Sequence, residues 1–474
     1  MDYEAIIGLE VHVQLRTSSK MFCACSAEYG APPNTHVCPV CLGYPGAMPV
    51  MNREAIRLTV MAGLMLGCRI SGYSKFDRKS YFYPDMPKNY QISQYDKPLC
   101  EGGDVAIEVD GRARSIGITR IHLEEDVAKN IHFEQVSGVD FNRAGIPLME
   151  IVSEPEMASP EEAFAFLSAL KAMLQYGDIS DCNLEEGNVR CDVNCSVRPA
   201  GQAELGTKTE LKNLNTFRGV QNALRYEIER QVGVLQAGGT IRQETRRWDV
   251  DRGTTSQMRT KEDAHDYRYF PEPDLMPVVL SAEQIEEWRG LLPELPQQRR
   301  HRFVDDYGLP EYDAGVLVAD KDVADYFEEV VSLEVEPKAA SNWIMTEVLR
   351  ELSEKGGNLS ELRVGPAALA ELIKLVAAKT INIPTAKELL TEMFEKGGDP
   401  AALVREKGLT QVSDASAIEE LVDRAMAENP GSVEDYRNGK TAAAKFLIGQ
   451  VMRLSKGKAD PRVVNEILER KLLS

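Results

Sequence analysis

The stretch IGLEVHVQL, residues 7–15, has apolar side chains at its odd positions and other residues at its even positions. This alternation predicts a half-buried β-strand, because successive side chains of a strand point to opposite faces of a sheet. The polar face of this strand would carry Glu10, His12 and Gln14. The stretch VRCDVNCSV, residues 189–197, repeats the pattern, and its polar face would carry Arg190, Asp192, Asn194 and Ser196. We therefore expect sheet strands whose polar faces gather ionisable groups.

The sequence changes character near LPELP, residues 292–296, a linker punctuated by proline. Strand-like segments and Gly/Pro turns prevail before it, with helices expected over 52–68 and 217–231. Apolar residues recur with a helical period after it, as at 367–378 and 386–395, and GGDP at 397–400 marks a second break. The predicted fold class is α+β, with domains at residues 1–293, 294–400 and 401–474.

Composition narrows the function classes. The chain of 474 residues is 43% hydrophobic and 27% charged, which is typical of globular proteins. Its net charge of −19 argues against wholesale coating of nucleic acid, which needs clustered Lys and Arg. No apolar run approaches the roughly 20 residues that span a bilayer. The first residues, MDYE, lack the basic and apolar regions of a signal peptide. We expect a cytoplasmic protein that does not enter a membrane.

Nine cysteines without a secretion signal favour a metal site over a disulfide framework. Cys23 and Cys25 are followed after twelve residues by Cys38 and Cys41, so two close thiol pairs supply four thiolates for a tetrahedral Zn²⁺. The alternatives are four buried thiols without metal, or His36 in place of one thiolate. Core packing is the expected role of the less regularly spaced Cys182, Cys191 and Cys195.

Two acidic residues flank a predicted hairpin. Asp192 and Glu210 lie on either side of a loop, and a hairpin centred on Gly201 would set their carboxylates opposite each other. Directly opposed carboxylates repel, so a fold would keep them paired only with a cation. Taken singly, each acid is more often a solvated surface group.

Further ligands are expected on neighbouring strands. Glu10 and His12 lie two residues apart on one strand, Glu125 ends a strand at 121–125, and Glu150 follows the apolar IPLM at 146–149. Carboxylates with one imidazole are mainly hard oxygen ligands, which suit Mg²⁺ and phosphate chemistry better than zinc. Their placement on strands favours the set as a whole rather than any single member.

Lys79 lies among aromatic residues in the sequence DRKSYFYP, residues 77–84. An ammonium between such walls could face a phosphate or a carboxylate, and the rings could stack on an unpaired base. The alternative is a lysine that extends over the edge of the core. The sequence contains no Walker A loop, no G-x-S-x-G elbow and no convincing Cys–His nucleophile pair.

Seven segments, in this order, closely resemble the B subunits of bacterial aspartyl/glutamyl-tRNA amidotransferases, the GatB family. They are IGLEVHVQL at 7–15, the four-cysteine loop ending in CPVCLG at 38–43, YFYPDMPK at 81–88, GNVRCDVN at 187–194, ELKNLN at 210–215, KEDAHDYRYFPEPD at 261–274 and GQVM at 449–452. The resemblance covers essentially the whole chain, and its motifs are highly specific. It implies an N-terminal antiparallel-sheet domain shaped like a cradle with a zinc-stapled loop, a helical middle domain and a helical tail similar to YqeY proteins.

The resemblance also implies an ATP-dependent amidotransferase, a carbon–nitrogen ligase with glutamine as amido donor. ATP would phosphorylate the side-chain carboxylate of Glu-tRNA(Gln) or Asp-tRNA(Asn), and ammonia would then displace the phosphate. By position, the implied site uses His12, Glu125 and Glu150 for Mg²⁺ and Glu10, Asp192 and Glu210 for ATP, with Lys79 nearby. Because the chain lacks a credible glutaminase nucleophile, ammonia would come from an amidase-type partner, which a small third partner joins in a heterotrimer.

A rival hypothesis is a non-catalytic, zinc-stabilised scaffold protein that binds tRNA and whose acids are structural. Both hypotheses expect tRNA contacts from the tail. Residues 401–474 hold 12 Lys and Arg against 11 Asp and Glu, whereas the other 400 residues carry a net charge of −20. A basic module on an acidic body is typical of a local phosphate contact, although charge runs are often only solvated helix faces.

Overall fold

The computed structural model describes residues 2–184, 186–260, 266–355, 359–409, 415–438, 440–455 and 459–473. Its contacts divide the chain into two compact units, Met1–Gln298 and Arg299–Ser474. The division falls in the first turn of α5 (Pro296–Asp305), close to the predicted boundary at residue 293.

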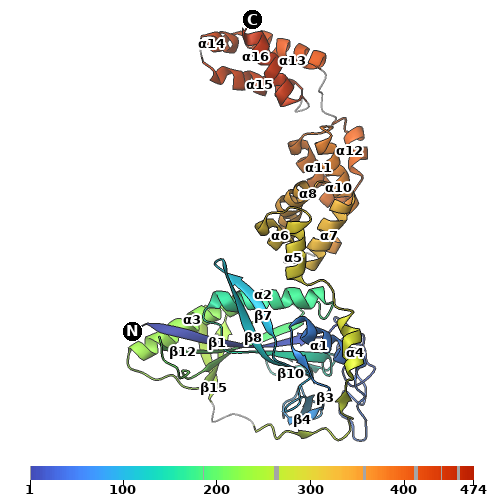
Figure 1. Cartoon of the computed structure of the whole chain (residues 1–474), viewed down its shortest axis with the longest axis vertical. Helices are drawn as coiled ribbons and strands as arrows, with labels where there is room; N and C mark the ends of the chain where they lie inside the picture. The colour runs from blue at the N-terminus through green and yellow to red at the C-terminus, as the bar shows by residue number, and fades with distance from the viewer. Residues whose placement is uncertain are drawn as a thin grey trace. The chain divides into compact units, whose positions relative to one another are not determined.

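A large sheet forms the centre of the first unit (Figure 1). Its strands follow the order β15-β14-β13-β12-β1-β11-β8-β6-β2, and β7 pairs with β8. Their bounds are β1 Tyr3–Gln14, β2 Arg69–Ile70, β6 Cys100–Glu101, β7 Asp104–Val109, β8 Arg112–Glu125, β11 Pro147–Ser153, β12 Val189–Pro199, β13 Thr209–Lys212, β14 Glu244–Asp249 and β15 Thr254–Thr260. The pairs are antiparallel except that of β13 and β14, which are parallel because α3 (Phe217–Gln236) connects them as a crossover. The predicted antiparallel sheet thus contains one parallel pair.

The alternating stretch forms β1, the middle of this sheet. Ile7 and Val13 are fully buried and Leu9 is 1% exposed, as the alternation predicts. They share one core with the helices α1 (Arg53–Met65), α2 (Pro160–Tyr176) and α3. Figure 1 shows α2 and α3 along one face of the sheet, and they contact each other. Each fully buried aliphatic side chain contributes roughly 1.5–3 kcal/mol, so this face is fixed and the opposite face is left for polar groups.

The predicted helices form with small changes at their ends. α1 begins at Arg53 because the Asn52 side chain accepts hydrogen bonds from the backbone N–H groups of Glu54 and Ala55. It ends at Met65, three residues before the predicted end at residue 68. Gly67, two residues after this end, has a φ of +71°, a left-handed conformation that favours glycine. Downstream, the predicted helix at 217–231 is longer and extends to Gln236.

A small three-stranded sheet lies beside the large one. Its order is β16-β4-β5, with β4 at Asp77–Ser80, β5 at Tyr90–Ser93 and β16 at Phe270–Pro271, and β5 contacts β8. The remaining short elements of this unit are β3 Tyr73–Ser74, which pairs with β17 Val278–Val279, the hairpin of β9 Lys129–His132 and β10 Ser137–Asp140, and α4 Ala282–Arg289.

The second unit is helical, as the sequence predicts, and contains two hydrophobic clusters. The first joins α5 to α6 (Glu311–Val318), α7 (Lys321–Ser332), α8 (Pro337–Trp343), α9 (Leu349–Lys355), α10 (Pro366–Ala377), α11 (Ile383–Lys396) and α12 (Pro400–Glu406). The second joins α13 (Ala415–Glu428), α14 (Pro430–Arg437), α15 (Ala442–Leu454) and α16 (Pro461–Leu473). Because Val404 and Leu409 pack in the first cluster, that cluster extends past the predicted boundary at residue 400.

No helix among the described residues has the length and apolar surface that crossing a bilayer requires.

Candidate active site and cysteine cluster

The polar face of the large sheet brings His12, Glu124 and Glu150 together. They come from β1, β8 and β11, and one ligand atom from each lies within 4.8 Å of the others. His12 Nδ1 is 3.2 Å from Glu124 Oε1 and 3.8 Å from Glu150 Oε2. The register sets His12 opposite Glu150 and Glu150 opposite His122, so these side chains share one face. One imidazole and two buried carboxylates form a donor set that fits a divalent cation, and we call these three residues the cation-fitting group.

The electrostatics of this group also indicate a need for positive charge. Burial opposes the charged imidazole, but the hydrogen bond and charge of Glu124 and the charges of Glu150 and Asp192 raise the pKa of His12 to about 9. Burial raises the pKa of Glu10, and the charge of Glu150 raises it further. The carboxylates of this face therefore favour a positive charge beside them.

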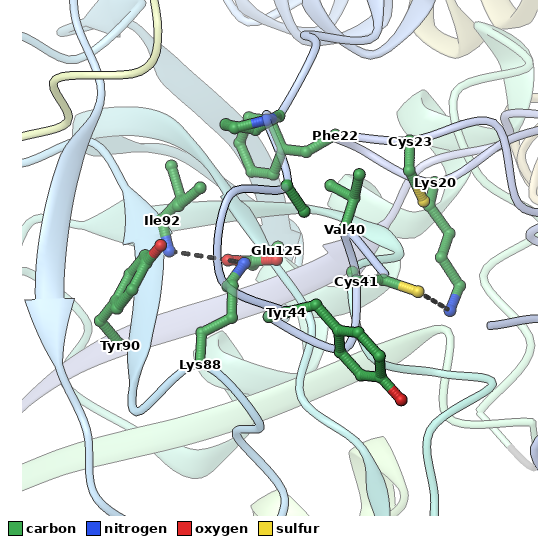
Figure 2. A pocket seen from close by; sticks show the side chains of 14 residues that line it. Lys20, Phe22, Cys23, Val40, Cys41, Tyr44, Lys88, Tyr90, Ile92 and Glu125 are labelled. Carbon is green, nitrogen blue, oxygen red and sulfur yellow. Dashed lines mark hydrogen bonds and ion pairs between the residues drawn. The ribbon is translucent and has the colours of Figure 1, made fainter. Parts of the chain in front are cut away.

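Glu125, which the resemblance implies as a ligand, lies on the opposite side of β8. Neighbouring residues of a strand point to opposite faces, so Glu124 rather than Glu125 reaches His12. Glu125 forms a buried ion pair with Lys88 and accepts the N–H of Ile92 at 2.9 Å. It lines a cavity of about 70 Å³, together with Cys23 and Cys41 of the cysteine loop. Figure 2 shows the side chains that line this cavity.

A second acidic group continues along the same face. Glu10 lies opposite Asp192, and the Asn194 side chain donates to Glu10 Oε1 at 2.9 Å. Lys212 contacts Asp192 closely and lies 3.2 Å from Glu210 Oε1. These two carboxylates raise the pKa of Lys212 above its usual range, although burial opposes the charge. Lys212 thus supplies a positive charge between the two acids.

The predicted opposition of Asp192 and Glu210 is wrong by two residues. Glu210 pairs with Asn194, because the connection turns at Gly201 and then continues through residues 202–208 before β13 begins. A hairpin symmetric about Gly201 would need connecting segments of equal length before and after this residue. Both carboxylates nevertheless lie on the polar face, since a shift of two residues preserves the side to which they point.

Lys79 lies on β4 at the margin of this face. Its Nζ is 4.9 Å from the centre of the Tyr267 ring. Burial opposes its charge, but Glu124, Tyr269, Tyr267 and Glu150 raise the pKa of Lys79. No carboxylate of the described residues lies within 4.0 Å of its ammonium, which is therefore available to a ligand.

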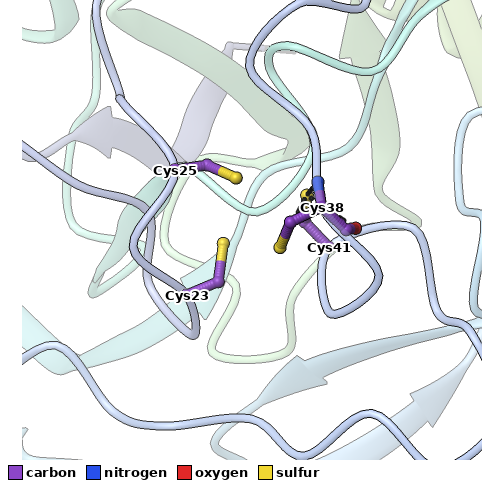
Figure 3. A group of neighbouring side chains, drawn as sticks. All are labelled: Cys23, Cys25, Cys38 and Cys41. Atoms are coloured by element: carbon purple, nitrogen blue, oxygen red, sulfur yellow. Dashed lines mark hydrogen bonds between the residues drawn. The ribbon is translucent and has the colours of Figure 1, made fainter.

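The four predicted cysteines converge, as Figure 3 shows. The sulfur atoms of Cys23, Cys25, Cys38 and Cys41 lie within 4.8 Å of one another, and those of Cys38 and Cys41 are 3.9 Å apart. Tetrahedral zinc with Zn–S bonds of ~2.3 Å needs sulfur atoms about 3.8 Å apart. The residues present therefore fit Zn²⁺.

The surroundings of the cluster favour a thiolate. The hydrogen bond from Cys23, the N–H of Cys38 and the charge of Lys20 lower the pKa of Cys41 to about 4, against the effect of burial. Lys20 Nζ lies 3.7 Å from Cys41 Sγ and 3.1 Å from the carbonyl oxygen of Phe141. His36 does not belong to the group of converging ligands. Cys182, Cys191 and Cys195 are buried in the core, which confirms their predicted role.

Sequence reasoning missed several polar residues of the site. The alternation of 121–125 could have revealed His122 and Glu124, which point to the same side as each other. His122 Nε2 lies 3.5 Å from Glu150 Oε2. Arg190 contacts Asp126 closely, and Gln14 donates to Asp126 at 2.9 Å, so a further ion pair borders the group. No local pattern marks Lys212 or Asp126, because only the pairing of distant strands brings them here.

Comparison with known proteins adds independent findings. Residues 5–286 match the family model of the GatB/GatE catalytic domain, and residues 325–472 match that of the GatB domain. The chain is 55% identical over 477 residues to a protein of Caldicellulosiruptor bescii, with 100% of this chain and 99% of the relative covered. A protein of Thermoanaerobacter pseudethanolicus is 55% identical over 474 residues, covering 100% of both chains. One of Thermodesulfovibrio yellowstonii is 54% identical over 469 residues, covering 99% of each. All three are named as B subunits of aspartyl/glutamyl-tRNA(Asn/Gln) amidotransferases.

Proposed function

Since this chain belongs to the family of aspartyl/glutamyl-tRNA(Asn/Gln) amidotransferase B subunits, we propose that it amidates glutamate or aspartate carried on tRNA. ATP phosphorylates the side-chain carboxylate, and ammonia then displaces the phosphate to give Gln-tRNA(Gln) or Asn-tRNA(Asn). A carboxylate is a poor acyl donor at neutral pH, and the acyl phosphate supplies the leaving group. The observation that carries the proposal is the polar sheet face, where the cation-fitting group adjoins further carboxylates.

His12, Glu124 and Glu150 would hold Mg²⁺. When bound, this ion would neutralise negative charge on phosphoryl oxygens. The chain itself contributes rigid placement, because each ligand comes from a different strand of one sheet. The Ser93 hydroxyl, 3.4 Å from Glu124 Oε2, helps to orient that carboxylate. Phosphoryl transfer needs such positioning more than covalent help.

The two ends of the site suit different substrates. Glu10, Asp192 and Glu210 lie toward β12 and β13, where Lys212 can contact the phosphates of ATP. Lys79 lies toward β4, where its ammonium can pair with the carboxylate of the charged amino acid. Transfer from ATP to the amino acid would then occur between them, at the cation-fitting group.

Ammonia would come from a partner protein. Burial raises the pKa of Cys68 to about 12 and also raises those of Cys100, Cys191 and Cys195, which makes them poor nucleophiles. The low-pKa thiol of Cys41 belongs to the cysteine cluster. We therefore propose that an amidase-type partner supplies the ammonia and that a small third partner completes the complex. Because the proposed substrate is a charged tRNA used in translation, we also propose that the complex is cytoplasmic.

One experiment distinguishes the proposed catalytic function from the rival hypothesis of a tRNA-binding scaffold. The purified complex is given Glu-tRNA(Gln), ATP and Mg²⁺, and ATP cleavage is compared between the wild type and His12→Ala. We expect cleavage that depends on charged tRNA and is lost in the variant. A scaffold would retain the same cleavage rate, since its acids and imidazole would be structural.

The cysteine cluster should hold one zinc ion. Cys38→Ser removes one ligand, so we expect zinc content to fall well below one per chain and the first unit to lose about 4 kcal/mol of stability. Metal analysis and thermal unfolding measure the two effects. Cys191→Ala is the control, since it lies in the core and should leave the zinc content unchanged. A zinc-free wild type, or a Cys38→Ser variant with unchanged stability, would contradict the site.

The tail should contact tRNA through α15. Lys445 and Arg453 are exposed on this helix, and no described residue forms an ion pair with either. The basic residues Lys456 and Lys458 lie outside the described residues. We expect Lys445→Ala with Arg453→Ala to weaken tRNA binding and to reduce the slope of log Kd against log salt by about 2. Truncation that removes α13–α16 should weaken binding further, while the partner still hydrolyses glutamine.

A matched pair of variants controls for charge. Arg424 and Arg462 are also exposed, but each forms an ion pair with a glutamate: Arg424 with Glu428, and Arg462 with Glu466. Arg424→Ala with Arg462→Ala should therefore change the salt slope little. Equal effects of the two double variants in a gel shift at several salt concentrations would show that α15 makes no specific phosphate contact.

A further inference from the structure

Two tyrosine rings are stacked beside the polar face. The ring centres of Tyr95 and Tyr269 are 4.3 Å apart and their planes differ by 12°. Tyr95 is 60% exposed, so one side of its ring contacts Tyr269 while the other is open to solvent. A single exposed tyrosine needs no explanation, but a parallel pair presents a flat, prepared aromatic surface.

Hydrogen bonds to β4 hold the two segments that carry these rings. The N–H of Tyr95 donates to Asp77 Oδ2 at 3.3 Å, and the N–H of Ser80 donates to the carbonyl oxygen of Tyr267 at 2.8 Å. Arg268 has a φ of +45°, a left-handed conformation that a side chain rarely adopts. Arg268 lies between Tyr267 and Tyr269, whose rings meet edge to face with their centres 6.1 Å apart. The surface is therefore fixed by β4 from two distant parts of the chain.

The stacked pair adjoins the cation-fitting group. Tyr95 lies two residues after Ser93, whose hydroxyl contacts Glu124. Tyr269 contacts Tyr267, and the ring of Tyr267 lies under the ammonium of Lys79. Burial raises the pKa of Tyr269. The charge of Lys79 lowers this pKa, whereas the charges of Glu124 and Glu150 raise it. The phenol of Tyr269 is therefore close enough to the cation-fitting group to interact with its charges.

The order of the strands separates this surface from the proposed nucleotide side. Asp192, Glu210 and Lys212 lie on β12 and β13, to one side of β1. Glu124 lies on β8, to the other side of β1, and β5, which ends two residues before Tyr95, contacts β8. If ATP phosphates occupy the first side, the stacked tyrosines face the second substrate.

We propose that the open ring face of Tyr95 binds the unpaired terminal base at the 3′ end of the charged tRNA. The proposal rests on the proposed function, in which the amino acid is esterified to that same terminal nucleoside. Base and reacting carboxylate therefore belong to one small unit, which must reach from the stacked tyrosines to Lys79 and the cation-fitting group. Aromatic side chains bind unpaired bases by stacking, and this contact needs no additional charge. Tyr95 acts as a positioning residue, with Tyr269 as its support.

The test uses the complete complex with Glu-tRNA(Gln). Tyr95→Ala should raise KM for charged tRNA about ten-fold, because stacking of one base is lost. KM for ATP should stay unchanged, and Tyr95→Phe should restore the wild-type value because it retains the ring. Tyr29→Ala is the matched control, since Tyr29 is also 60% exposed but lies in the cysteine loop.

A binding comparison tests the same contact without catalysis. Uncharged tRNA(Gln) should bind the wild-type complex about ten-fold more tightly than the same tRNA without its terminal nucleoside, and Tyr95→Ala should abolish that difference. Retention of the difference would overturn the proposal even in a complex that proves inactive. A raised KM for ATP would assign the stacked tyrosines to ATP instead. Failure of the complex to assemble, with unchanged tRNA binding, would assign them to a protein partner.

Discussion

We expect Glu124→Gln to reduce acyl-phosphate formation on charged tRNA at least about a hundred-fold, because it removes one charged ligand of the cation-fitting group. The Glu125→Gln variant should retain most of the wild-type rate of acyl-phosphate formation. The two residues are neighbours on β8, and they point to opposite faces. The measurement is ATP cleavage that depends on Glu-tRNA(Gln), followed without glutamine so that ammonia delivery does not enter.

The pair is closely matched as a control. Glu124 is 2% exposed and Glu125 is 3% exposed, and each is joined to a positively charged partner or an imidazole. Both variants should therefore lower the unfolding temperature to a similar extent, which thermal unfolding can check. If Glu125→Gln abolished phosphorylation and Glu124→Gln did not, the ligand set implied by the family resemblance would be right and the assignment to the polar face would fall.

Asp192→Asn should have a comparably large effect, at least about a hundred-fold on acyl-phosphate formation. It keeps the size and hydrogen-bonding capacity of the side chain but removes one negative charge. Lys212 would then be left with Glu210 alone, and the proposed contact with ATP phosphates would be disturbed. We expect near-normal tRNA binding and continued glutamine hydrolysis by the partner.

Glu4→Gln provides the control for this variant. Glu4 lies on the polar side of β1 and pairs with Arg198 at 2.6 Å, but it lies far along the strand from His12. Removal of the negative charge of Glu4 should leave phosphorylation of the charged tRNA unchanged. Normal ATP-dependent amidation at low Mg²⁺ in both Asp192→Asn and Glu210→Gln would show that these acids are structural.

The strands and helices could be predicted where one residue pattern decides them. The alternation at 7–15 sets β1, since a shift by one residue would bury Glu10 and His12 and expose Leu9. The pairing register could not be predicted in the same way. The loop after Gly201 determines that Glu210 faces Asn194, and its arms are unequal in length.

Much of the candidate site depends on contacts between distant segments. The alternation does distinguish Glu124 from Glu125, but it does not tell which of the two faces meets His12. That choice follows from the pairing of β8 with β11 and of β11 with β1. The small sheet of β16, β4 and β5 has strands too short to leave a periodic pattern, yet it places Tyr269 beside Tyr95. The cysteines were predictable because their spacing alone is specific.

The most direct measurement gives the purified complex Glu-tRNA(Gln), γ-labelled ATP and Mg²⁺ without glutamine or ammonia. The proposed function predicts labelled acyl phosphate on the charged tRNA, formed only when the tRNA carries glutamate, and its conversion to Gln-tRNA(Gln) when ammonia is added. Uncharged tRNA(Gln) under the same conditions should give no labelled product. Amidation that proceeds without ATP, or an absence of label on the charged tRNA while the complex is assembled and binds it, would contradict the proposed catalytic role.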